Sequence, residues 1–131
     1  MKSFKAITSS IILLSLLSCL TNIVPPGWNF LGKRQVNLSV DHDTVTIPSG
    51  AKTLGRLLIV VRINDLEIYD IKVTFESGEV FDAKFRGRFL ANRDTQIIDL
   101  PGGARRVSRV DFRYRSLLRT ARRAEVELWG K

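Results

Sequence analysis

Short segments in which apolar and polar residues alternate constrain the fold of this 131-residue chain more than any other feature. A period of two residues is typical of a β-strand with one buried face, and these segments are rich in β-branched residues and bounded by turn-forming residues. The expected strands are 36–40, 44–47, 56–63, 68–75, 80–89, 95–100, 108–114 and 123–129. About eight short strands at this spacing predict an all-β fold, an antiparallel, jelly-roll-like β-sandwich.

The alternation also predicts which side chains fill the core, because successive side chains of a strand point to opposite faces. The expected core residues are Phe75, Phe85, Val110, Phe112, Val126 and Leu128. At least one of Trp28 and Trp129, which lie near the two ends of the chain, is expected to close the core between the first and last strands. Stacking of a tryptophan on a sugar is the alternative.

The segment Leu100–Gly103 contains a Gly-Gly pair, which raises the question of a phosphate-binding loop. Pro101 suits the second position of a type II turn, and Gly102 suits the third, where φ is positive. A phosphate loop would need the spacing Gly-x-x-x-x-Gly-Lys-Ser/Thr and a following helix, whereas an alternating strand follows here. The segment therefore predicts a turn.

The N-terminus resembles an export signal. Lys2 and Lys5 precede an apolar stretch from Ala6 to Leu20 that is shorter than the ~20 residues a membrane-spanning helix needs. The sequence Leu16-Leu17-Ser18-Cys19 resembles a lipobox, in which a signal peptidase cuts before a cysteine that is lipidated. Two outcomes are open, lipidation of Cys19 or plain cleavage nearby, and both predict a mature protein in the periplasm or cell envelope.

Length and cysteine content predict one domain held together by its core. The expected division is a signal peptide at 1–19, a linker at 20–35 and the β-sandwich at 36–131. Because Cys19 is the only cysteine, the folded part can form no intramolecular disulfide and no zinc site built on cysteines. No cofactor is expected.

Basic residues are concentrated in the second part of the chain. Residues 84–131 contain 13 basic and 5 acidic residues, whereas residues 20–83 contain 6 and 8. If the segments 84–90 and 109–115 lie in one sheet, their outer faces form an anion-binding surface. The candidate residues are Arg86, Arg88, Arg109, Arg113 and Arg115. The partner would be an anionic glycan, a lipid headgroup or an acidic protein, and the alternative is a solvated face that keeps the protein soluble.

Other chemistry has little support in the sequence. His42 is the only histidine and is flanked by Asp41 and Asp43, whose carboxylates suit a hard cation. Three such residues between two strands are more typical of a turn, and two aspartates are too few ligands, so no metal site is predicted. The chain contains no Gly-x-Ser-x-Gly motif, and no catalytic residue is predicted. Export and the lack of a nucleic-acid-reading motif argue against nucleic acid as a partner.

Several segments resemble a known family. The sequences GWNFLGKRQV, DHDTVTI, IYDIKVTFESGEVF, IDLPGGARRV and AEVELWG are similar to those of small exported bacterial proteins classed as a domain of unknown function, the group that includes YaaI-like proteins. The resemblance implies export and a β fold, and no catalytic or binding residues. We therefore expect a non-catalytic binding or structural module of the cell envelope; the alternative is an enzyme or metal-dependent activity centred on Asp41, His42 and Asp43.

Overall fold

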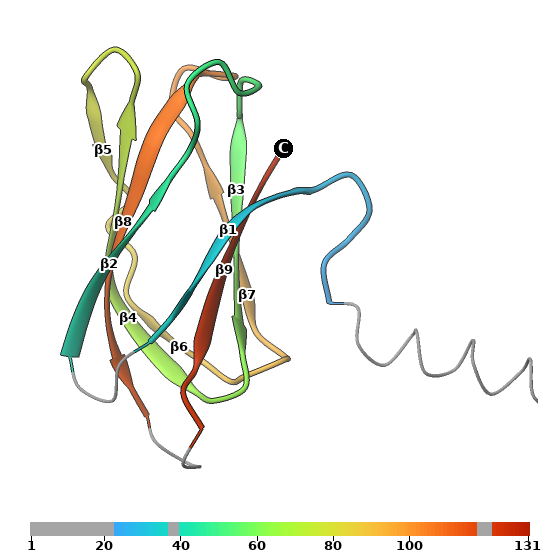
Figure 1. Cartoon of the computed structure of the whole chain (residues 1–131), viewed down its shortest axis with the longest axis vertical. Helices are drawn as coiled ribbons and strands as arrows, with labels where there is room; N and C mark the ends of the chain where they lie inside the picture. Colours follow the sequence, from blue (N-terminus) through green and yellow to red (C-terminus); the bar gives the residue numbers. More distant parts are fainter. Residues whose placement is uncertain (1–22, 37–39, 118–121) are drawn as a thin grey trace, which may run out of the picture.

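The computed structural model of the chain describes residues 23–36, 40–117 and 122–131, which form nine β-strands (Figure 1). The strands are β1 (Asn29–Gln35), β2 (Val40–Thr46), β3 (Arg56–Arg62), β4 (Leu66–Phe75), β5 (Val80–Asp82), β6 (Gly87–Phe89), β7 (Thr95–Asp99), β8 (Val107–Ser116) and β9 (Glu125–Gly130). The predicted all-β fold is confirmed. Within these ranges, no helix is long and apolar enough to cross a membrane.

The strands form two antiparallel sheets that pack against each other, as the two layers in Figure 1 show. One sheet has the order β1-β9-β3-β7, and we call it the β9 sheet. The other has the order β2-β8-β4-β5, with β6 also paired to β4, and we call it the β8 sheet. The pairs β1 with β9, β2 with β8 and β3 with β7 nest around the β4–β5 hairpin, which is the strand order of a jelly roll.

The core lies between the two sheets and is filled by the inward-facing residue of each alternating pair. Five of the six predicted core residues are buried, namely Phe75, Val110, Phe112, Val126 and Leu128. Phe85 is only partly buried, because it lies between β5 and β6 at the edge of the sheet, where its ring packs 5.6 Å from the ring of Phe89. The predicted turn at Leu100–Gly103 is also present, with φ of +84° at Gly102.

The predicted linker at 20–35 is wrong for residues 29–35, which form β1 at the edge of the β9 sheet. Arg34 pairs with Val126 of β9, and Gln35 pairs with Glu125. An edge strand needs a partner on one side only, and charged residues protect its free side from pairing with other chains. The polar residues Lys33, Arg34 and Gln35 are therefore compatible with an edge strand, although in the sequence they look like part of a linker.

The predicted turn at Asp41–Asp43 is also wrong, because these residues lie inside β2. The whole strand pairs with β8, from Val40 opposite Arg115 to Thr46 opposite Arg109. Aspartate has a low intrinsic preference for strands, but pairing and packing against a neighbouring strand outweigh it. Strand β2 runs without interruption over 40–46, where a turn was expected between two strands; residues 37–39 of the first expected strand lie outside the described part of the chain.

The predicted strand at 80–89 is divided into β5 and β6. Lys84, between them, has a φ of +51°, and its backbone N–H donates to Asp82 Oδ1 at 2.8 Å. A positive φ at a residue with a side chain interrupts the extended backbone. Both short strands still pair with β4, so the segment stays in the β8 sheet.

Candidate anion-binding face

The outer surface of the β8 sheet carries most of the candidate arginines, and we call it the arginine face. Alternation along β8 points Arg109, Asp111, Arg113 and Arg115 outward, while Val110, Phe112 and Tyr114 point into the core. The segments 84–90 and 109–115 lie in one sheet, as the proposed surface requires, but they are separated by β4. Strand β4 therefore contributes its own charged residues between the two sets of arginines.

Cross-strand register arranges the arginine face in rows. The rows are Thr46, Arg109 and Thr74; Thr44, Asp111 and Lys72; His42, Arg113 and Asp70; and Arg115, Glu67 and Arg88. Basic and acidic side chains alternate across β8 and β4. The alternation along 108–114 already places Asp111 on this surface, and β4 adds Glu67 and Asp70, which makes the face a mixed one with an excess of basic groups.

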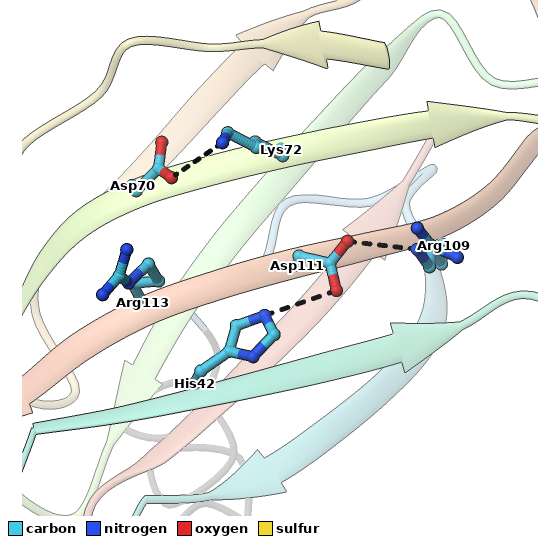
Figure 2. Close-up of a pocket in the computed structure, with 6 residues that line it drawn as sticks. All are labelled: His42, Asp70, Lys72, Arg109, Asp111 and Arg113. Carbon is cyan, nitrogen blue, oxygen red and sulfur yellow. Dashed lines mark hydrogen bonds and ion pairs between the residues drawn. The ribbon is translucent and has the colours of Figure 1, made fainter. Parts of the chain in front are cut away.

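A shallow depression of about 440 Å³ lies at the centre of the arginine face (Figure 2). It is lined by His42, Asp70, Lys72, Arg109, Asp111 and Arg113. The Asp111 carboxylate accepts a hydrogen bond from the Thr44 hydroxyl at 2.5 Å. Its oxygens also lie 3.2 Å from Arg109 Nε and 3.5 Å from His42 Nε2. Asp70 lies 3.8 Å from Lys72 Nζ. Both carboxylates of the depression are therefore engaged by neighbouring groups.

Arg113 differs from the other arginines of β8. It lies opposite His42 on one side and Asp70 on the other, and its side chain is exposed. Figure 2 shows it at the depression without an ion pair, and it makes none within the described part of the chain. Its guanidinium therefore offers its N–H donors to a partner from outside.

Two of the remaining candidate arginines, Arg86 and Arg115, lie beside Tyr69, which forms a bulge in β4 where the register shifts between Ile68 and Asp70. The guanidinium of Arg86 lies 5.1 Å from the centre of the Tyr69 ring, and that of Arg115 lies 5.7 Å from it. Arg115 also binds Glu67 at 2.7 Å. Contact with a ring face and a carboxylate fixes the orientation of a guanidinium. Tyr69 was not expected at the site, because a bulge leaves no signal in the sequence.

The three residues of the Asp-His-Asp segment do not converge on one point. His42 lies on the arginine face, whereas Asp43 points the other way and accepts a hydrogen bond from the Tyr114 hydroxyl. Burial, and then the hydrogen bond to Asp43, raise the pKa of Tyr114 far above its usual range. Among the described residues, no three His, Cys, Asp or Glu side chains form a group that could hold a metal ion. The segment therefore does not form the single cation site considered from the sequence.

Two further sequence predictions concern residues at the ends of the chain. Cys19 lies outside the described residues. Trp28 and Trp129 do not enter the core between the sheets; they pack on the outer surface of the β9 sheet, against a small cluster formed by Val24, Leu58 and Val60. The expectation that one of them closes the core is wrong, because the outward-facing side of β9 carries Trp129 while Leu128 takes the inward position.

Comparison with known proteins gives the chain a family. A search of the curated proteins finds no match. A family model described as a domain of unknown function matches residues 8–130, and thus covers the arginine face and both sheets. The match agrees with one part of the resemblance noted in the sequence, namely that the chain belongs to a family of unknown function. The chain belongs to the family described as Domain of unknown function (DUF2541).

Proposed function

We propose that the protein is a non-catalytic, exported module of the cell envelope that binds an anionic partner through the arginine face. The observation that carries the proposal is Arg113, an exposed guanidinium that lines the depression and whose donors are not used by a carboxylate of the described chain. The partner is a polyanion, such as an anionic glycan, an array of lipid headgroups or an acidic protein surface.

The arrangement of β8 supports a partner with repeated charges. Alternate residues of a strand are separated by roughly 7 Å, so Arg109, Arg113 and Arg115 present three guanidinium groups along one line. Asp111 holds Arg109, and Glu67 holds Arg115, whose other N–H donors stay available. Because the ion pairs already order the side chains of Arg109 and Arg115, their binding to a partner loses less conformational entropy than binding through flexible lysines would.

The location of the protein is part of the same proposal and depends on its N-terminus. The positive residues Lys2 and Lys5, the apolar stretch and the lipobox-like sequence before Cys19 support export followed by lipidation. Metabolic labelling with a fatty-acid analogue should mark the wild-type protein and should not mark Cys19→Ser. An unlabelled wild-type protein would contradict lipid attachment, and a protein retained in the cytoplasm would contradict export.

The binding proposal is tested by two variants with equal loss of charge. One carries Arg109→Gln, Arg113→Gln and Arg115→Gln on the arginine face. The control carries Lys33→Gln, Arg34→Gln and Lys52→Gln, in β1 and in the segment between β2 and β3. On immobilised heparin, attraction falls with salt because the screening length is ~10 Å at 0.1 M. The first variant should elute at clearly lower salt than the control.

Arg113 alone should account for much of the difference, since its guanidinium has no competing carboxylate. Arg113→Gln should elute earlier than Lys33→Gln, whose side chain lies 3.9 Å from Glu125. If the two triple variants elute together, total charge governs retention, and the arginine face is a solvated surface.

A further inference from the structure

The outer surface of the β9 sheet carries a row of apolar side chains that crosses all four strands. Phe30 of β1 pairs with Trp129 of β9, Trp129 pairs with Leu58 of β3, and Leu58 pairs with Ile97 of β7. We call these four residues the apolar row. The ring of Phe30 meets the ring of Trp129 edge to face, with centroids 5.2 Å apart.

The segment before β1 covers the middle of the apolar row and leaves its ends exposed. Ile23, Val24 and Trp28 pack with Leu58, which is 1% exposed. Phe30 is 51% exposed and Ile97 is 42% exposed, at opposite ends of the row. The row and its covering segment therefore form one apolar surface with aromatic groups on it.

Charged residues around this surface are mostly paired with one another. Arg62 binds Glu127 at 2.9 Å, Arg56 binds Asp99 at 2.7 Å, and Lys33 lies 3.9 Å from Glu125. The Trp129 indole N–H also donates to Glu127, at 3.0 Å. Attraction of this surface to a partner would thus depend on apolar area, in contrast to that of the arginine face. Tryptophans with an apolar body and a satisfied N–H are typical of the boundary between lipid headgroups and acyl chains.

The position of the chain before Ile23 indicates which partner the surface meets. The apolar stretch Ala6–Leu20 precedes it, and the four Cα-to-Cα steps from Cys19 to Ile23 span at most about 14 Å. Ile23 lies on the β9 sheet. With the chain held by the proposed lipid on Cys19, on which the inference below depends, the surface around the apolar row is the part of the domain nearest the bilayer.

We infer that the protein docks on the surface of a phospholipid bilayer through the exposed parts of Phe30, Ile97, Trp28 and Trp129. The apolar groups enter the boundary between headgroups and acyl chains, where burial of apolar area supplies the binding energy. The arginine face lies on the outer side of the opposite sheet. Docking therefore turns the arginine face away from this bilayer and leaves it accessible to a separate partner, an anionic glycan or an acidic protein rather than the headgroups of the same bilayer.

The two tryptophans are the only ones in the chain, and both lie at the proposed contact, so their fluorescence reports on it directly. The full-length protein is bound to phosphatidylcholine vesicles with bromine in the acyl chains, and flotation confirms that it is bound. Docking predicts a blue shift of the emission and loss of most of its intensity, compared with vesicles without bromine. Floating protein with unquenched tryptophans would overturn the inference.

Variants of exposed residues test the contact without disturbing the core. Phe30→Thr with Ile97→Thr should lower the ratio of docked to undocked protein by roughly tenfold and restore emission in brominated vesicles. Threonine retains a preference for strands. The matched control is Val80→Thr, because Val80 is 56% exposed on β5 of the other sheet, and this variant should be quenched like the wild type. Equal quenching of both variants would contradict docking.

Two further readouts separate this inference from the proposed function of the arginine face. Quenching should persist at 1 M salt, where heparin binding is lost, and the triple arginine variant should be quenched like the wild type. A blue shift that depends on protein concentration in the absence of vesicles would show that the surface binds a second copy of the chain, and would overturn docking on lipid.

Discussion

The two sheets share one core but have opposite chemistry on their outer surfaces. Asp111 lies at the centre of the outer surface of β8, where it contacts Thr44, His42 and Arg109. Leu58, the corresponding central residue of β3, is buried beneath the segment that precedes β1. Burial alternates along β8, whose outer face is exposed, whereas β3 is buried on both faces because another segment of the chain covers its outer side.

The largest expected effect lies in the core, which the two sheets share. Phe112→Ala removes a fully buried ring between the sheets and should lower the free energy of unfolding by about 3 to 5 kcal/mol. Chemical denaturation measures the change. A loss much below this range would show that the two layers are not packed through β8.

The two outer surfaces should differ sharply when their central residues are truncated. Leu58→Ala should destabilise the protein by about 2 to 4 kcal/mol, because it leaves a cavity under Ile23 and Val24. Asp111→Ala should cost at most about 1 kcal/mol, because it breaks partly exposed ion pairs. Similar losses in the two variants would mean that the outer surface of β3 is not covered in solution.

The contrast between the sheets also explains what the sequence could predict. Val110 and Phe112 were predicted because alternation within one strand is visible along the chain. The members of the apolar row come from four strands, and Asp70 and Asp111, which line the depression, come from two strands. Only the register between strands brings these residues together, and that register cannot be seen along the chain. Strand β1 and the inward-facing Asp43 were missed because their stabilising partners are distant: Asp43 accepts its hydrogen bond from Tyr114, 71 residues away.

The inner side of β2 provides a test that depends on pH. The pKa of Tyr114 is raised in the folded protein but lies near 10 in the unfolded chain, so above pH 10 the unfolded state loses a proton that the native state keeps. The free energy of unfolding should therefore fall by up to ~1.4 kcal/mol per pH unit from this group. Tyr114→Phe should make the fall between pH 10 and 11 less steep. An unchanged slope would place the hydroxyl in water.

The smallest effect on stability should come from the residue that matters most for the proposed binding. Arg113→Gln removes an exposed side chain without an ion pair in the described structure, so the free energy of unfolding should change by less than ~0.5 kcal/mol. Denaturation curves of the variant and the wild type should overlap. A larger loss would show that Arg113 stabilises the fold, and would weaken its role as a group available to a partner.

The strand order has a consequence for when the chain can fold. Strands β8 and β9 follow the other seven strands in the sequence, yet each is an interior strand of its sheet: β8 lies between β2 and β4, and β9 lies between β1 and β3. The β8 sheet cannot be completed until β8 has left the ribosome, nor the β9 sheet until β9 has, and contacts between distant parts of a chain form slowly. A newly made chain therefore lacks a complete sheet until β8 has been made. For a protein exported as we propose, this delay keeps the polypeptide incompletely folded, in a state that can be translocated, until it reaches the membrane.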